Sequence, residues 1–192
     1  MKLAESFISG AIAALVSLFL IEAVAIAMQL LFSENGAAAP ELLFYAPSLV
    51  VLAVLIEEAA KFFIINKKIS LLADRKSIVK GALALGLGFS SIEALFIFLG
   101  SPSLEKLPLA ISSVAIVHVS TAVMIAYAIE WLRMRRLRVF AVAILPAAVA
   151  HLAFNLSLMR EREIFTVSVL TVLVLALLTA SMSMLKAKRE LA

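Results

Sequence analysis

Cysteine is absent from this chain of 192 residues. Its absence excludes disulfide bonds, thiolate metal ligands and a cysteine nucleophile. Charge is also scarce: charged residues make up 16% of the chain and hydrophobic residues 64%, whereas soluble domains have about 25% and about 45–50% respectively. Together with a mean hydropathy of +1.12, this composition excludes a soluble globular domain and predicts a polytopic membrane protein.

Long polar stretches are missing too, because only short polar breaks separate the apolar runs. Each run is close to or above the length of about 20 residues that crosses a bilayer as a helix. The sequence therefore predicts an all-α, polytopic membrane helical bundle of about six transmembrane helices, at residues 5–32, 42–66, 78–100, 108–132, 138–159 and 163–185. Since the breaks leave no room for a soluble domain, we expect one integral-membrane domain over residues 1–192, with its functional core at about residues 42–159.

Basic residues gather in alternate breaks, and this pattern predicts an orientation. They surround the second and fourth breaks and the C-terminus, at Lys67, Lys68, Arg75, Lys76, Lys80, Arg133, Arg135, Arg136, Arg138, Lys186, Lys188 and Arg189. Because positive charge concentrates on the cytoplasmic side of membrane proteins, we expect a multi-pass protein of the cell membrane with both termini cytoplasmic. The net charge of +4 then reflects orientation rather than nucleic-acid binding, and no sequence feature indicates an oligomer.

Two adjacent glutamates and a lysine interrupt the second apolar run, in the segment IEEAAKFF at residues 56–63. A charge near the middle of a spanning helix costs about 2.5–3.5 kcal/mol on insertion scales, so Glu57, Glu58 and Lys61 need a protein interior around them. On a helix, Glu57 and Lys61 are four positions apart and share a face, with Glu58 one step round. We therefore expect these side chains to point into the bundle and to form part of a buried site.

Three further spans each carry an ionisable residue in their interior, namely Glu93, His118 and His151. At about 1.5 Å per residue, Glu57 lies about 15 Å from the nearest flanking basic residue, and the other three lie about 20–22 Å from theirs. All four therefore fall near the centre of a hydrocarbon core about 30 Å thick. A lone membrane histidine commonly makes a helix–helix hydrogen bond, as Asn155 one turn after His151 also can. However, so many polar groups at one depth exceed what packing needs, and we expect them to converge in one pocket.

This set of side chains suits the hydrolysis of an amide by activated water. A glutamate in an apolar pocket can take a proton from water, Lys61 can hold the other glutamate of the pair ionised, and a histidine can assist or donate to an oxyanion. Alternatively, Glu93, His118 and His151 can form a two-histidine, one-carboxylate zinc site with Glu57 as the general base. Because the chain has no His-Glu-x-x-His motif, a glutamate mechanism without a cofactor and a zinc mechanism both stay open.

Taken in order, these motifs resemble those of the PrsW-type intramembrane proteases. That family shares a superfamily with the CAAX-processing and bacteriocin-processing proteases and with the multipass scaffold subunit of gamma-secretase. The resemblance rests on Glu57-Glu58-x-x-Lys61, Phe89-x-x-x-Glu93, His118 and His151-x-x-x-Asn155. Glu93 stands where the CAAX proteases carry histidine and the PrsW type carries glutamate, whereas Ala94 stands where PrsW proteins often carry asparagine.

The resemblance implies an intramembrane endopeptidase that cleaves membrane-anchored protein or peptide substrates. Glu57 would be the base that activates water, His118 the histidine of the third motif, and His151 with Asn155 would stabilise the oxyanion. Two other classes stay open. One is a non-catalytic scaffold or substrate-binding subunit, and the other is a proton-coupled transporter, which buried Glu and His residues can also build. The transporter is the weaker alternative because the chain shows none of the paired repeats common in transporters.

Overall fold

The computed structural model describes residues 3–32, 47–72, 74–100, 105–132, 137–159 and 163–186. Within them the chain forms α1 (Leu3–Phe32), α3 (Pro47–Ile64), the π-helical η1 (Ile65–Ile69), α4 (Arg75–Gly100), α5 (Leu107–Leu132), α6 (Leu137–Met159) and α7 (Glu163–Lys186). The predicted all-α fold is confirmed, and each predicted span coincides with one of the long helices. Residues 42–46 of the second predicted span lie outside the described part of the chain.

Five of the described helices are long and apolar enough to cross a membrane, at Leu3–Met28, Arg75–Gly100, Leu107–Trp131, Ala141–Met159 and Ile164–Lys186. The chain is therefore a multi-pass membrane protein. The remaining long helix, α3, has only 18 residues and carries Glu57, Glu58 and Lys61. It packs against α1, α5 and α6, so its three charged side chains have apolar helices as neighbours.

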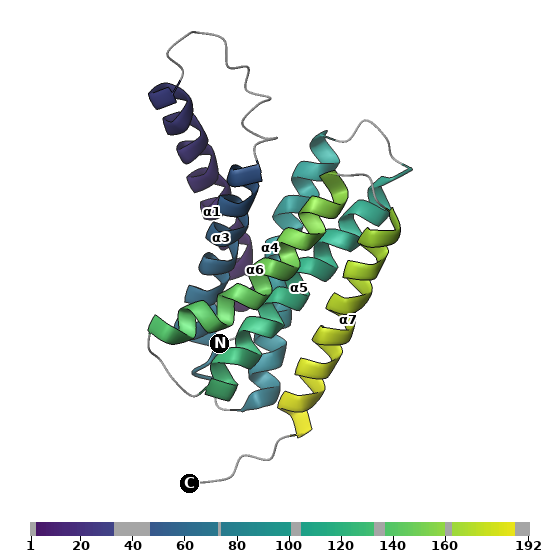
Figure 1. Cartoon of the computed structure of the whole chain (residues 1–192). Coiled ribbons are helices and arrows are strands. Elements are labelled where there is room, and N and C mark those ends of the chain that lie inside the picture. The colour runs from purple at the N-terminus through teal and green to yellow at the C-terminus, as the bar shows by residue number, and fades with distance from the viewer. Residues whose placement is uncertain are drawn as a thin grey trace.

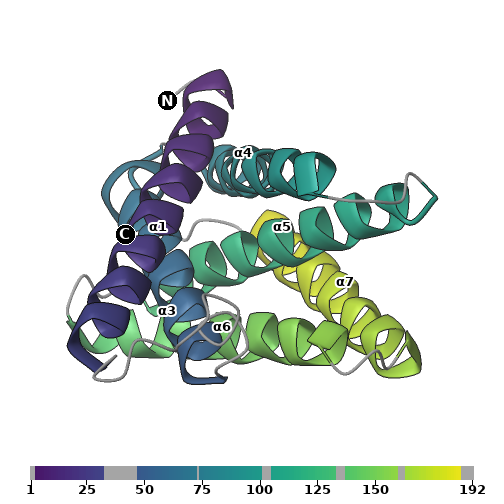
Figure 2. The ribbon, with the colours of Figure 1, turned by 90° about the horizontal axis from the view of Figure 1, so that it is seen from above.

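The arrangement of the helices places α3 beside the centre of the bundle. Seen from above (Figure 2), α5 lies in the middle, with α4 on one side and α6 on the other, while α7 packs across α5 and α6. α1 and α3 close the remaining side (Figures 1 and 2). The principal apolar core fills the space between α3, η1, α4, α5, α6 and α7, with fully buried residues such as Ile65, Leu85, Ile125 and Ala147.

Glycines allow α1 to cross α4 in direct backbone contact. A Cβ atom at Gly88 would overlap the carbonyl oxygen of Phe7, and one at Gly10 would overlap the carbonyl oxygen of Leu85. Small residues at such positions let membrane helices approach closely. The crossing therefore fixes α1 against α4 near the start of α1, and this contact positions one wall of the site described below.

Most basic side chains of the described residues lie at one end of the bundle, which is the lower end in Figure 1. Lys67 and Lys68 lie in η1, Arg75 begins α4 and Lys186 ends α7. Arg75 Nε donates a hydrogen bond of 3.0 Å to Oε1 of Glu130, which joins the start of α4 to the end of α5. This ion pair thus ties α4 to α5 at the basic end of the bundle.

Candidate active site

The two adjacent glutamates of α3 have different surroundings. Glu58 and Lys61, three positions apart, turn into the bundle, where both side chains are 0% exposed and Lys61 Nζ lies 2.7 Å from Glu58 Oε1. Glu57 lies one step round the helix and keeps 14% of its side chain exposed. The sequence placed Lys61 on the same face as Glu57, but the ion pair of the lysine is with Glu58.

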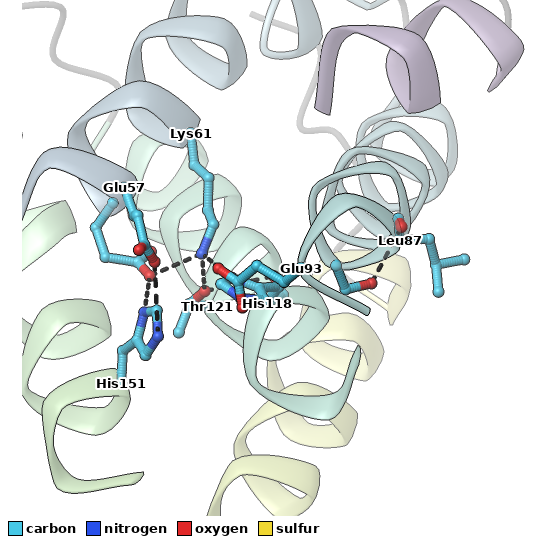
Figure 3. A network of polar contacts seen from close by, with 9 residues as sticks. Glu57, Lys61, Leu87, Glu93, His118, Thr121 and His151 are labelled. Atoms are coloured by element: carbon cyan, nitrogen blue, oxygen red, sulfur yellow. Dashed lines mark hydrogen bonds and ion pairs between the residues drawn. The ribbon is translucent and has the colours of Figure 1, made fainter. Parts of the chain in front are cut away.

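The buried Lys61 ammonium joins α3 to α5 (Figure 3). Besides Glu58, it lies 2.7 Å from Nδ1 of His118 and 3.0 Å from Oγ1 of Thr121. Its Nζ also lies 4.7 Å from the centre of the Phe89 ring, within the range of a cation–π contact. An ammonium has three N–H groups and no acceptor, so all three donors are used. The two partners on α5 also explain why the amine points towards Glu58.

His118 extends this network to α4. Because its Nδ1 accepts a hydrogen bond from Lys61, its Nε2 carries the ring proton and donates to Oε2 of Glu93 at 2.7 Å. The Phe89 ring packs against the imidazole with 4.6 Å between ring centres. His118 is therefore buried and fixed on both nitrogens, whereas 32% of the Glu93 side chain is exposed.

His151 of α6 faces both glutamates of α3 (Figure 3). Its Nδ1 lies 2.7 Å from Oε1 of Glu58 and donates to it, and its Nε2 lies 3.7 Å from Oε2 of Glu57. In a neutral imidazole, a protonated Nδ1 leaves Nε2 as an acceptor. Oε2 of Glu57 is buried and has no hydrogen-bond partner among the described residues. Two acceptors that face each other in this way suit a proton, a water molecule or a cation between them.

A cavity of about 550 Å³ lies in front of this pair, between α1, α3, α4 and α6. Its polar floor consists of Glu57, Glu93, His151 and Asn155. Its remaining lining is apolar and comes from α1 and α4, at Ala14, Leu18, Ile21, Phe89, Ile92, Phe96 and Ile97. A largely apolar cavity with a few convergent polar groups is the usual form of a binding site.

The structure thus brings the seven candidate residues from the sequence into one region. Six of them form a connected set of contacts, namely Glu57, Glu58, Lys61, Glu93, His118 and His151. The seventh, Asn155, lies in the cavity floor one turn after His151. Glu58, Lys61 and His118 lie behind the floor and are buried, so they contact the other site residues rather than the cavity.

Three contributions were missed by reasoning from the sequence. Thr121 holds Lys61, and its only signal is its position three residues after His118, on the same face of α5. Phe89 enters the sequence pattern only as the first residue of Phe89-x-x-x-Glu93, and its contacts with both Lys61 and His118 were not foreseen. The third is α1, which lies outside residues 42–159 and has no polar motif, yet supplies three residues of the cavity wall.

The donor atoms at the floor and directly behind it suit a metal ion. Glu57, His118 and His151 each offer one ligand atom, and these atoms lie within 4.8 Å of one another in the described part of the chain. Two imidazoles and a carboxylate form a common zinc ligand set, and the unpaired Oε2 of Glu57 faces the acceptor nitrogen of His151. The hydrogen bond from His151 Nδ1 to Glu58 is also the kind of outer contact that orients metal-bound histidines. These residues therefore fit a metal when a ring nitrogen of His118 exchanges its hydrogen bond to Lys61 or Glu93 for the ion.

Comparison with known proteins identifies a family. A family model described as "PrsW family intramembrane metalloprotease" matches residues 2–182. No curated protein and no solved structure matched the chain.

Proposed function

The chain belongs to the PrsW family of intramembrane metalloproteases, and we propose that it is an endopeptidase that hydrolyses peptide bonds of membrane-anchored substrates in the cavity between α1, α3, α4 and α6. The observation that carries this proposal is the pair formed by Glu57 Oε2 and His151 Nε2, which face each other across 3.7 Å at the cavity floor. A hydrolase needs a buried group that can accept a proton from water beside the scissile bond.

Glu57 is the carboxylate on which the chemistry depends. It is the member of the glutamate pair that reaches the cavity, and its Oε2 is not committed to a hydrogen bond in the described structure. In a glutamate mechanism, Oε2 takes a proton from the attacking water, and the same proton is then delivered to the leaving amine. Glu93, the second carboxylate of the floor, is held by His118 and borders the same space.

A developing oxyanion needs a donor on the same floor. Asn155 offers an amide N–H₂ group one helical turn from His151, and both residues line the cavity. A preorganised donor of this kind stabilises the tetrahedral intermediate of acyl transfer more than the ground state. We assign this role to Asn155, with His151 next to it.

Glu58, Lys61 and Thr121 are positioning residues in this proposal. Glu58 holds Nδ1 of His151, and Lys61 holds Nδ1 of His118. Since each imidazole is fixed through one nitrogen, its other nitrogen has a defined direction, towards Glu57 for His151 and towards Glu93 for His118.

Zinc is the cofactor that the donor set suits. The residues that would hold it are His118, His151 and one glutamate: Glu57 is the carboxylate within 4.8 Å of both histidines, and Glu93 is the one named by the sequence pattern. When bound, zinc supplies a Lewis acid for the peptide carbonyl and a more acidic water. The glutamate that does not ligate is then the base. The zinc content of the purified variants Glu57→Gln and Glu93→Gln separates the two assignments. Only the change of the ligating glutamate to glutamine lowers the zinc content.

We also propose that residues 1–192 form a single integral-membrane domain of the cell membrane with both termini cytoplasmic. The support is the gathering of Lys67, Lys68, Arg75 and Lys186 at one end of the bundle, since basic residues favour the cytoplasmic side. Reporter fusions to each terminus test this orientation.

Cleavage by the purified protein tests the function. The full chain in proteoliposomes, with a single-span reporter, should yield two fragments, and Glu57→Gln should yield none. Glu105→Gln makes the same chemical change at an exposed position before α5 and should cleave like the wild type. A scaffold or a transporter, the alternatives from the sequence, would give no fragments from the purified wild-type chain.

A further inference from the structure

Two helices in close contact, α1 and α4, also form the apolar side of the cavity. α1 and α4 are in backbone contact at Gly10 and at Gly88. Farther along both helices they diverge: in Figures 1 and 2 the later turns of α1 lie away from α4 and towards α3. Leu18 and Ile21 of α1 line the cavity beyond the crossing point, as do Phe96 and Ile97 of α4.

The side chains at this divergence are accessible from outside the bundle. Phe96 is a wall residue of the cavity and at the same time is 47% exposed. Leu18, Ile21 and Ile97 are half-buried, and Glu93 next to them keeps 32% of its side chain exposed. The cavity is therefore open between the parts of α1 and α4 that lie apart. Since both helices are apolar and long enough to span a membrane, this opening faces the surrounding membrane.

The size of the cavity limits what can enter it. One turn of a helix with its side chains, about 10–12 Å across and 5.4 Å long, fills roughly 400–600 Å³. A cavity of about 550 Å³ therefore holds only a few residues of a substrate. The rest of a substrate span must stay in the lipid outside, which requires a lateral opening. Those few residues must also be unwound, because a helical segment keeps its carbonyl groups in its own hydrogen bonds.

We infer that the substrate enters laterally between α1 and α4, and that Leu18, Ile21, Phe96 and Ile97 contact an unwound, apolar segment next to the scissile bond. This inference rests on the proposed proteolytic function and names the surface that selects its substrates. Aliphatic and aromatic walls favour an apolar side chain at that position, whereas Glu57 and Glu93 at the floor disfavour an acidic one.

Photo-crosslinking tests the contact. A benzophenone amino acid replaces Ile21 or Phe96 in the full chain carrying Glu57→Gln, in proteoliposomes with the single-span reporter. The control replaces Val172, which is 65% exposed on α7, a helix that contributes no residue to the cavity. We expect crosslinks to the reporter from positions 21 and 96, and no crosslink from position 172.

The outcomes separate the inference from the proposed function. Cleavage by the wild type without crosslinks at positions 21 and 96, or with an equal crosslink at position 172, overturns the lateral surface and leaves the protease. Crosslinks at positions 21 and 96 without cleavage by the wild type support the surface and reject the protease. If neither cleavage nor crosslinks are seen, both are rejected.

A specificity ratio gives a second measurement that does not depend on the amount of folded protein. Two reporters differ only in the residue next to the scissile bond, which is Ala in one and Phe in the other. Phe96→Ala should shift the ratio of their kcat/KM values towards the Phe reporter by about tenfold or more, the usual effect of pocket size on discrimination. An unchanged ratio in Phe96→Ala and in Leu18→Ala would overturn the selecting role of this wall.

Discussion

The site has two sides that contrast in burial and in access to the cavity. On the inner side, around Lys61, each N–H of the ammonium has an acceptor, and the side chains of Glu58 and Lys61 are fully buried. On the cavity side, Glu57 is partly exposed and its Oε2 has no hydrogen-bond partner in the described structure. Glu57 and Glu58 are identical in chemistry and adjacent in sequence. One step round a helix therefore separates a glutamate that orients its neighbours from one that is available to a substrate.

This contrast shows how a charged site is kept inside a membrane. A buried ion pair is tolerated when its remaining donors and acceptors are also paired. On the inner side, His118, Thr121 and His151 pair the remaining N–H groups of Lys61 and Oε1 of Glu58, whereas Oε2 of Glu58 has no hydrogen-bond partner in the described structure. Each of the two glutamates thus has one unpaired oxygen, but only Glu57 lines the cavity, where a substrate, a water molecule or an ion can pair with it. The polar side chains that hold the helices together, Glu58 and Lys61, are thus different from the one that is available to a substrate, Glu57.

The pair Glu57→Gln and Glu58→Gln tests the contrast most strongly. Glu57→Gln should lower the cleavage rate by about 10²–10⁴-fold, the usual contribution of a general base, and should change stability by less than about 1 kcal/mol. Glu58→Gln removes the anion from a buried ion pair and should lower the free energy of unfolding by about 3–5 kcal/mol. Reporter cleavage and thermal unfolding in detergent measure the two effects. Equal losses of stability in both variants would mean that the two glutamates do not differ as described.

Lys61→Met tests whether the inner side is a single unit. The variant leaves Glu58 buried without its counter-ion, so we expect a loss of about 3–5 kcal/mol in the free energy of unfolding. When both charges are removed, in the double variant Lys61→Met with Glu58→Gln, no unpaired charge remains, and the loss should be smaller than the sum of the single losses. Additive losses, measured by the same unfolding assay, would show that the two charges act independently.

Metal removal tests the cavity side. Because the family is one of metalloproteases and the donor atoms of Glu57, His118 and His151 cluster within 4.8 Å, we expect a chelator to abolish cleavage and added zinc to restore it. His151→Ala should lower bound zinc, measured by elemental analysis of the purified protein, by about 10-fold or more. His118 and His151 also contact the inner side, so each variant needs an unfolding curve as its control. Cleavage that is insensitive to chelators would instead favour hydrolysis by Glu57 without a metal.

Much of the fold was predictable because a bilayer imposes one simple rule on sequence. Apolar runs of span length predicted each described long helix, and the rarity of charge within them pointed to Glu57, Glu58, Lys61, Glu93 and His118. The family was predictable from the order of the same motifs and is confirmed by the family match. Polar residues in a membrane core are conspicuous, and this property makes such a site readable from one sequence.

The pairing of the polar side chains and the shape of the cavity were not predictable from the sequence. Spacing allowed Lys61 to pair with either glutamate, and only the position of His118 and Thr121 on α5 decides for Glu58. The wall from α1 gave no signal, since Leu18 and Ile21 look like any lipid-facing residues. Apolar residues in a membrane protein carry little information about whether they face lipid, another helix or a substrate.

Thr121→Val should have the smallest effect and asks whether the inner side contributes only support. Valine keeps the shape of threonine but removes an acceptor, so one N–H of Lys61 is left unpaired at a cost of about 1–3 kcal/mol. Thr171→Val is the matched control, because Thr171 is exposed on α7 and bonds only its own helix, at the carbonyl of Val167. Cleavage per folded molecule should stay within about threefold of the wild type, since the bonds from Lys61 to His118 and from Glu58 to His151 remain. A much larger fall in kcat, with unchanged stability and KM, would mean that the inner network takes part in the reaction and that the two sides of the site are not separate.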